Sequence, residues 1–215
     1  MGSEHVDIIS AEGVVFQSII RYPEIRISRG KTTFIHGPSG CGKSTLLKLI
    51  NGTVSPGQGQ IFYDGEDIEK IDTIRLRREI LLVGQSVFLF TGTIEENFIK
   101  YYGYRDLDPP GKEAIQKFLS ICSADFPLET RCETMSGGER QRVYIAIFLS
   151  FMPKVLIMDE PTSALDSLSA ETMMNNIKRF STENDITAIV VSHSLSLAEK
   201  YGDQMIVLER GKDNA

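Results

Sequence analysis

The sequence predicts an α/β fold whose core is a mostly parallel sheet covered by helices on both faces. Three observations support this prediction. Short apolar strands alternate with helical segments along most of the 215 residues, and this order is typical of parallel sheets. A hydrophobic content of 41% is enough for a buried core. Residues 86–135 contain mostly helix-forming segments, which we interpret as a lobe inserted between strands of the core.

The first part of the chain is rich in β-forming residues. Its apolar and β-branched runs predict strands over 7–10, 14–20, 25–27, 32–36, 60–63 and 80–83. The composition of residues 45–50 predicts a short helix that stops at Asn51-Gly52.

The middle of the chain predicts helices over 93–99 and 112–121, separated by the breaker Asp108-Pro-Pro-Gly111. The core is expected to resume with helices over 137–151 and 169–180 and strands over 155–158, 186–191 and 205–208. We therefore predict one domain over 1–215, with a core of about 1–85 and 136–215 and a helical subdomain of about 86–135.

Composition argues against several classes of protein. The net charge of −6 argues against a nucleic-acid-binding surface, so no nucleic-acid partner is expected. The longest apolar run, 143–152, is shorter than the roughly 20 residues of a membrane-spanning helix. Cys41, Cys122 and Cys132 lack metal-ligand spacing and fit a reduced, cytoplasmic setting.

A glycine-rich loop between an expected strand and an expected helix matches G-x-x-x-x-G-K-[ST]. Its glycines let backbone N–H groups turn toward an anion, and the helix N-terminus adds partial positive charge. Lys43 is expected to reach the β and γ phosphates of a nucleotide, and Ser44 to hold Mg²⁺. The alternative is a turn that binds nothing. The residues expected to contact the nucleotide here are Gly37, Pro38, Ser39, Gly40, Cys41, Gly42, Lys43, Ser44 and Thr45.

Polar residues follow three further expected strands. Asp159 and Glu160 end the apolar run over 155–158, and parallel strands deliver such groups to one edge of the sheet. Asp159 is predicted to hold Mg²⁺, and Glu160 to act as general base or to position a water. The alternative is a strand end capped by solvated acids. Gln85 could contact Mg²⁺ or the attacking water, and His193 faces the same edge; each could also be an ordinary surface residue.

A second glycine motif lies far along the chain, at Ser136-Gly137-Gly138, directly before an expected helix. Such a motif can cap the helix and offer N–H groups to an anion. One nucleotide does not need two glycine cradles unless the second belongs to another copy of the protein.

Together these residues resemble the ATP-binding cassette (ABC) ATPases, the motor subunits of ABC transporters. Residues 37–45 match the family's Walker A motif, Gln85 its Q-loop, 136–141 its signature and 155–160 its Walker B strand. Residues 163–166 match the D-loop, and His193 the switch histidine. The resemblance implies a P-loop NTPase core with an N-terminal antiparallel β subdomain and an inserted α-helical subdomain.

The resemblance also implies an aromatic residue that stacks on adenine before Walker A. Phe16 is the nearest candidate, and Tyr22 remains an alternative. Met135 and Glu139 depart mildly from the usual signature residues. The segment 89–97 looks like that of export-type members, which hints at the direction of transport.

The implied assembly is a head-to-tail dimer, formed with a second copy or a related subunit, around two Mg²⁺–ATP. Each ATP would lie between Walker A of one subunit and Ser136–Gly138 of the other. Lys43, Gln85, Glu160 and His193 would serve hydrolysis, and a transmembrane permease would hold the protein at the cytoplasmic face of the membrane. Phe88, Leu89 and Phe90 could dock this permease or simply pack inside the lobe. The alternatives are a small-molecule kinase, a soluble ABC ATPase acting on nucleic acid or ribosomes, and a binding-only subunit.

Overall fold

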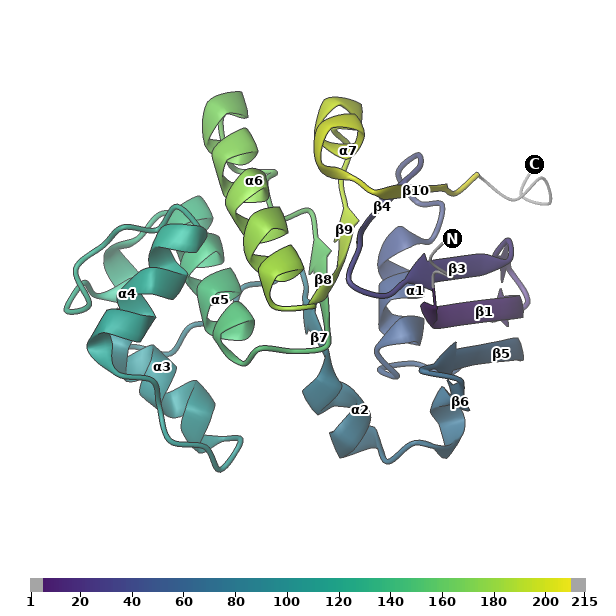
Figure 1. Ribbon diagram of the computed structural model, residues 1–215, viewed down its shortest axis with the longest axis horizontal. Coiled ribbons are helices and arrows are strands. Elements are labelled where there is room, and N and C mark those ends of the chain that lie inside the picture. Colours follow the sequence, from purple (N-terminus) through teal and green to yellow (C-terminus); the bar gives the residue numbers. More distant parts are fainter. Residues whose placement is uncertain (1–5, 210–215) are drawn as a thin grey trace.

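A five-stranded parallel sheet forms the centre of the fold (Figure 1). The computed structural model describes residues 6–209, so residues 1–5 and 210–215 of the predicted domain lie outside it. Every pairing in this sheet is parallel, as predicted from the alternation of strands and helices. The strands, in their order across the sheet, are β10 (Gln204–Val207), β4 (Thr32–His36), β9 (Thr187–Val191), β8 (Val155–Asp159) and β7 (Ile80–Val83).

The central strands are buried on both faces because their sequences are continuous apolar runs. Every residue of β8 and β9 is buried, which is typical of a parallel sheet covered by helices. Alternate residues of β8 enter different cores. Leu156 and Met158 join the core beneath the helical lobe, whereas Val155 and Ile157 join the core beneath the second sheet.

The helices divide between these two cores. The core on one face of the sheet takes side chains from α5 (Gly137–Ser150), α6 (Ser167–Glu183) and α7 (Leu195–Tyr201). The core on the other face takes side chains from α1 (Lys43–Ile50) and α2 (Thr73–Glu79). Figure 1 shows α1 between the parallel sheet and the second sheet.

The second sheet is antiparallel and contains β1 (Asp7–Phe16), β2 (Ile20–Arg21), β3 (Ile25–Ser28), β5 (Gln58–Tyr63) and β6 (Glu66–Asp67). The expected strand over 14–20 is wrong at 17–19. Gln17 and Ser18 have positive φ angles of 49° and 57°, and the Ile19 N–H donates to the Phe16 carbonyl at 3.0 Å. This turn reverses the chain between β1 and β2.

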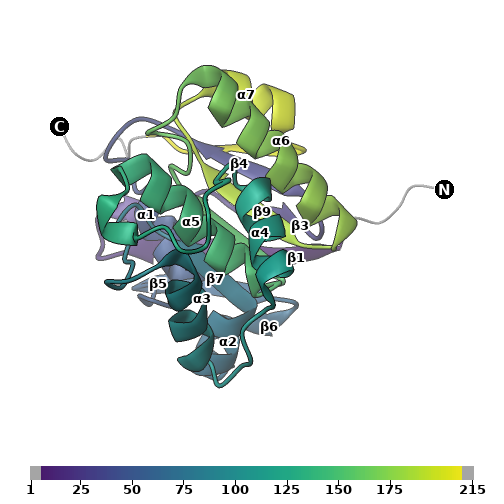
Figure 2. The ribbon, with the colours of Figure 1, turned by 90° about the vertical axis from the view of Figure 1, so that its left-hand side faces the viewer.

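The helical lobe stands apart from the antiparallel sheet and is seen from its own side in Figure 2. It contains α3 (Ile94–Gly103) and α4 (Lys112–Ile121), which pack against α5. Thr93 begins α3 with a capping box that includes Glu96, an arrangement that satisfies N–H groups left free at a helix start. Buried Ile115 and Leu119 on α4 supply apolar contacts to the shared core.

Two helices of the structure, α2 and α7, were not expected from the sequence. Each has seven residues, so neither provides a long periodic signal. Their N-caps, Asp72 and Ser194, accept hydrogen bonds from the backbone N–H groups of Arg75 and Leu197. Among residues 6–209, every helix is too short or too polar to cross a lipid bilayer.

Candidate active site

The loop between β4 and α1 has a conformation that requires glycine at its two motif positions. Gly42 begins α1 with a φ angle of 96°, which side-chain-bearing residues rarely adopt. A Cβ atom on Gly37 would lie 2.4 Å from the Leu208 carbonyl oxygen. Both glycines therefore allow the backbone to take a path that other residues would block.

Lys43 is folded back over this loop. Its side chain is buried, and the Nζ atom donates to the Gly37 and Pro38 carbonyl oxygens at 2.7 and 3.0 Å. A buried ammonium needs such acceptors because desolvation disfavours its charge.

One pocket of about 250 Å³ gathers most of the residues predicted from the motifs. They come from the loop after β4 and from the carboxyl ends of β7, β8 and β9, which meet at one edge of the sheet. Ile20, at the start of β2, also lines the pocket and was not predicted. The lining residues are Ile20, Ser39, Gly40, Gly42, Lys43, Ser44, Thr45, Gln85, Asp159, Glu160 and His193.

The pocket offers oxygen ligands suited to Mg²⁺. Asp159 is 6% exposed, and its Oδ1 atom is buried without a hydrogen-bond partner among the described residues. A carboxylate oxygen left in this way is costly unless a cation or donor completes it. The Ser44 hydroxyl belongs to a residue lining the same pocket. Carboxylate and hydroxyl oxygens are hard ligands of the kind Mg²⁺ prefers, so the residues present fit this ion.

Glu160 and His193 form a pair at the mouth of the pocket. Glu160 Oε1 lies 3.0 Å from His193 Nε2. Burial raises the pKa of Glu160, and nearby His193 partly opposes this shift. Glu160 has a positive φ of 56°, and its N–H donates to the Val191 carbonyl at the end of β9. The backbone is thus held in an uncommon conformation that keeps the carboxylate at the sheet edge.

The second glycine motif is outside this pocket. Ser136 is the N-cap of α5 and forms a capping box with Glu139, and both Ser136 and Gly137 are exposed. Gly138 packs against the D-loop segment, where an added Cβ would lie 3.1 Å from Ala164 Cβ. Ser136, Gly137 and Gly138 do not line the phosphate pocket of the same chain.

The helix that carries this motif is nevertheless hydrogen-bonded to the sheet edge that carries Glu160. Gln141 Nε2 donates to the Glu160 carbonyl oxygen at 3.1 Å, and Gln141 is buried. The sequence placed Gln141 in a motif but gave it no role. Only the fold brings it to the end of β8.

The two aromatic candidates for adenine stacking have different environments. Tyr22 is 7% exposed, and its hydroxyl donates to the Gly42 carbonyl at 2.9 Å, beneath the loop. Burial raises its pKa to about 12. Phe16 is half-buried at the end of β1 and lies outside the pocket lining. A buried tyrosine under the loop is unavailable to a base, which leaves Phe16 as the candidate.

A glycine loop before a helix, with acids at the end of a neighbouring parallel strand, defines a P-loop nucleotide-binding protein. The family model described as "ABC transporter" matches residues 21–163. The chain therefore belongs to the ABC transporter family, as its motifs predicted, and it is an ABC-type ATP hydrolase.

Curated relatives support the same family. The chain is 36% identical to "ABC transporter I family member 17" of Arabidopsis thaliana, over 90% of this chain and 74% of that protein. It is also 36% identical to "Fe(3+) ions import ATP-binding protein FbpC" of Vibrio cholerae, over 90% of this chain and 55% of that protein. The chain thus spans only about half the length of some curated relatives it matches.

Solved structures share the fold over almost the whole chain. A structure described as a dimeric form of MJ0796, a bacterial ABC transporter cassette, aligns with a TM-score of 0.82 at 28% identity, covering 94% of this chain and 95% of that one. A bacterial Atm1-family ABC exporter with ATP bound aligns with a TM-score of 0.83 at 27% identity, covering 95% of this chain and 38% of that one. The predicted fold class is therefore confirmed.

Proposed function

We propose that this protein is the ATP-driven motor subunit of an ABC transporter, and that two subunits close head to tail around two Mg²⁺–ATP. A transmembrane permease would hold the subunits at the cytoplasmic face of the membrane. The observation that carries the proposal is the position of Ser136 and Gly137. They form an exposed helix N-terminus suited to an anion, yet they lie outside the phosphate pocket of their own chain.

The chain's own residues account for the steps of hydrolysis. Lys43 exchanges its bonds to the Gly37 and Pro38 carbonyls for bonds to the β and γ phosphates. Asp159 and Ser44 would hold Mg²⁺, which supplies neutralising charge to those phosphates when bound. Glu160 accepts a proton from the water that attacks the γ phosphorus, and the bond to the bridging oxygen of ADP breaks.

His193 and Gln85 complete this arrangement from the ends of neighbouring strands. His193 contacts the Glu160 carboxylate and orients it. Gln85 lies in the pocket at the point where β7 leads into the helical lobe. It can therefore couple changes in the pocket to movement of that lobe. ATP contacts both subunits and ADP contacts mainly one, so phosphate release favours the open form.

The test is Glu160→Gln, which removes the proton acceptor while keeping the shape of the side chain. ATP binding should persist, turnover should fall by at least about a hundredfold, and ATP-bound dimers should accumulate on size-exclusion chromatography. The matched control is Glu183→Gln on α6, an exposed position where turnover should be unchanged. Normal turnover in Glu160→Gln would remove this residue from the reaction.

The direction of transport is a separate hypothesis. The segment 89–97 resembles export-type members, and one similar solved structure is of an exporter. However, the FbpC relative is named as an import protein. We propose export on the basis of the segment. In inside-out vesicles, whose ATPase subunits face the added ATP, cargo should then accumulate in the lumen, and ATP-dependent release from the lumen would contradict export.

A further inference from the structure

His36, the last residue of β4, is bonded through its side chain to the loop that carries His193. Its Nδ1 atom lies 3.2 Å from the Ser192 carbonyl oxygen. A carbonyl oxygen can only accept, so Nδ1 carries the proton and donates. The bond joins residues 156 positions apart in sequence. They lie at the ends of β4 and β9, which are neighbours in the parallel sheet (Figure 1).

This bond begins where the backbone pairing of the two strands ends. The last paired residues of β4 and β9 are Ile35 and Val191, so His36 and Ser192 are each one position further on. The next residue after β4 is Gly37, which opens the glycine loop. The imidazole therefore continues the connection between the two strands at the point where their backbones separate.

The backbone of His36 is itself held from the opposite side. Its carbonyl oxygen accepts from the N–H group of buried Leu208 at 2.8 Å. His36 also directly precedes Gly37, whose carbonyl oxygen accepts from Lys43 Nζ. A residue fixed in this way can hold the Ser192 carbonyl in a constant position relative to the phosphate-binding loop.

His193 depends on its backbone for its position, because its side chain is 58% exposed and packing therefore restrains it little. It lies between Ser192, whose Oγ atom accepts from the Ser194 N–H at 3.1 Å, and Ser194, the N-cap of α7. The bonds of Ser192 therefore determine where the His193 imidazole meets the Glu160 carboxylate.

We propose that His36 is a positioning residue for ATP hydrolysis, which keeps His193 in contact with Glu160 by holding the Ser192 carbonyl. This inference rests on the proposed function, in which His193 orients the general base. His36 does not line the phosphate pocket, so it acts through His193 and not on the nucleotide. Its loss should therefore lower turnover without weakening ATP binding.

A purely structural role of this bond would have a different consequence. The Ser192 carbonyl belongs to a buried residue, and buried polar groups are usually hydrogen-bonded. A bond that served only this need would contribute to stability and leave kcat unchanged. Positioning predicts instead a loss of kcat that depends on the presence of His193.

The test compares His36→Asn with His36→Leu. Asparagine has an N–H donor the same number of bonds from Cβ as Nδ1 of histidine, whereas leucine has a similar branched shape without a donor. His36→Leu should lower kcat by about three- to tenfold and change KM for ATP by less than about twofold. His36→Asn should keep most of the wild-type kcat.

Thr33→Val is the matched control, because it removes a different side-chain bond of β4. The Thr33 Oγ1 atom donates to Gln204 Oε1 at 3.1 Å, on the side of β4 that faces β10. Its kcat should match that of the wild type. All rates are measured below the lowest melting temperature of the set. His36→Ala, which lacks the donor and adds no apolar volume, takes the place of His36→Leu if that variant unfolds.

A double-mutant cycle shows whether His36 acts through His193. In the His193→Ala background, adding His36→Leu should change kcat by less than about twofold, because the group that His36 positions is absent. Independent losses that multiply in the double variant would overturn the proposal. A wild-type kcat in His36→Leu, or equal losses of kcat in His36→Leu and His36→Asn, would overturn it as well.

The same variants separate this proposal from the proposed function. A wild-type rate of ATP hydrolysis in His193→Ala would contradict the role of His193 in the proposed function, and with it the positioning by His36. Loss of activity in His193→Ala with a normal kcat in His36→Leu would contradict the positioning by His36 alone.

Discussion

Single residues of the pocket owe their positions to the ends of strands. Lys43, Asp159 and Glu160 could be predicted because a short motif fixes each of them relative to a strand or a helix. Ile20 could not, because nothing local indicates that an apolar residue of a two-residue strand turns toward the pocket. In the sequence, Phe16 is the nearest candidate for adenine stacking with Tyr22 as an alternative, and the burial of Tyr22 is what separates them.

At this scale we predict that Phe16→Ala weakens ATP binding, whereas Tyr22→Phe does not. Removing Phe16 would remove a stacking surface for adenine, and the affinity should fall by about tenfold, or roughly 1.4 kcal/mol. Removing the Tyr22 hydroxyl breaks its bond to the Gly42 carbonyl and should cost about 1 kcal/mol of unfolding free energy. Isothermal titration and urea unfolding measure the two effects. A normal ATP affinity in Phe16→Ala would exclude it as the adenine contact.

The packing of the helical lobe depends on buried polar contacts that could not be predicted from the sequence. Asn97 on α3 is fully buried. Its Oδ1 atom accepts from the Phe90 N–H at 2.8 Å, and its Nδ2 donates to the Phe90 and Thr93 carbonyls at 3.0 and 2.9 Å. This side chain fixes the backbone of Phe90 to the start of α3.

We predict that Asn97→Ala destabilises the protein by about 1–3 kcal/mol, because it leaves partly buried backbone groups of Phe90 without their side-chain partner. Urea unfolding measures the difference. Asn175→Ala is the control, since Asn175 is an exposed residue of helix α6. If the two variants unfolded alike, the Asn97 contacts would contribute nothing to stability.

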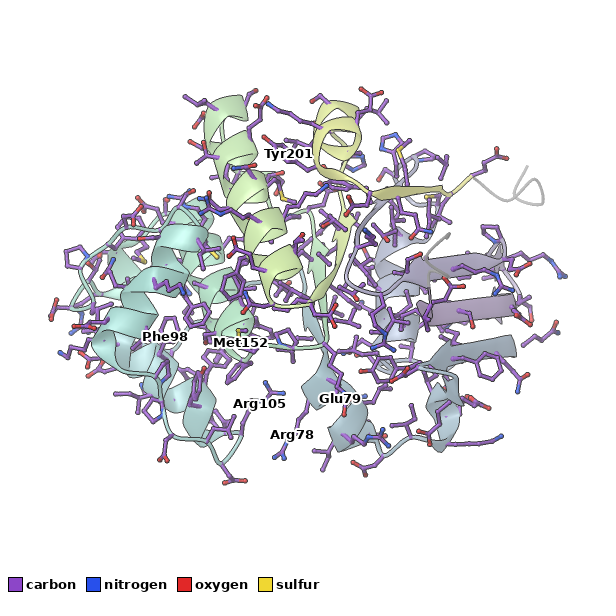
Figure 3. The ribbon with its side chains drawn as sticks, in the orientation of Figure 1. Arg78, Glu79, Phe98, Arg105, Met152 and Tyr201 are labelled. Atoms are coloured by element: carbon purple, nitrogen blue, oxygen red, sulfur yellow. The ribbon has the colours of Figure 1, made fainter. Side chains whose placement is uncertain are left out.

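Glu79, the last residue of α2, bonds to β5 and to the residue before β8, at the sheet edge opposite the pocket. Its Oε2 atom accepts from the Tyr63 hydroxyl at 2.7 Å and from Lys154 at 3.0 Å, and Figure 3 marks its position at the end of α2. Burial raises its pKa, but the bonds to Tyr63 and Lys154 outweigh this and hold the pKa below the usual value. Folding therefore favours the charged form.

Because folding lowers the pKa of Glu79, its contribution to the free energy of unfolding depends on pH. The stabilisation by Glu79 should be complete above the ordinary glutamate pKa of about 4.3 and should disappear as the pH falls through the lower pKa of the folded state. Glu79→Gln should thus be less stable than the wild type at pH 7, and this difference in stability should disappear in acid. Thermal unfolding from pH 7 to pH 3 measures it. A difference that is constant with pH would show that the charge of Glu79 is not involved.

The main elements of the core could be predicted because long apolar runs and helical periodicity leave little choice. The expected helix over 112–121 coincides with α4, and the helix over 137–151 with α5 to within one residue. The short helix α2 was missed, although Asp72 gave an N-cap signal. The division into core and helical subdomain stays a prediction.

For the whole molecule, the predicted shared site leads to a complementation experiment. Lys43→Ala lacks its own phosphate contact, and Ser136→Arg blocks its contribution to a partner's site. Each variant alone should be inactive. A mixture forms some heterodimers in which the Lys43 of one subunit faces the Ser136 of the other, so part of the ATPase activity should return.

The size of the recovery depends on whether one intact site can turn over by itself. Recovery should increase with the fraction of heterodimer, measured by titrating one variant into the other. The control mixture is Lys43→Ala with Lys43→Ala/Ser136→Arg, which cannot form an intact site. Equal activity in the two mixtures would refute the combined claim that the site is shared between subunits and that one intact site can turn over.

Because Gln141 bonds to the Glu160 carbonyl, helix α5 is connected to both nucleotide sites of the proposed dimer. The N-cap Ser136 lies five positions before Gln141 on the same helix, a rise of about 7.5 Å. In the proposed dimer, the first turn of α5 contacts the nucleotide bound by the neighbouring subunit. The second turn, through Gln141, positions Glu160, the general base for the nucleotide bound by the same subunit. A displacement of α5 caused by one nucleotide therefore also moves Glu160 at the other. We expect ATP hydrolysis at the two sites to be coupled and not independent.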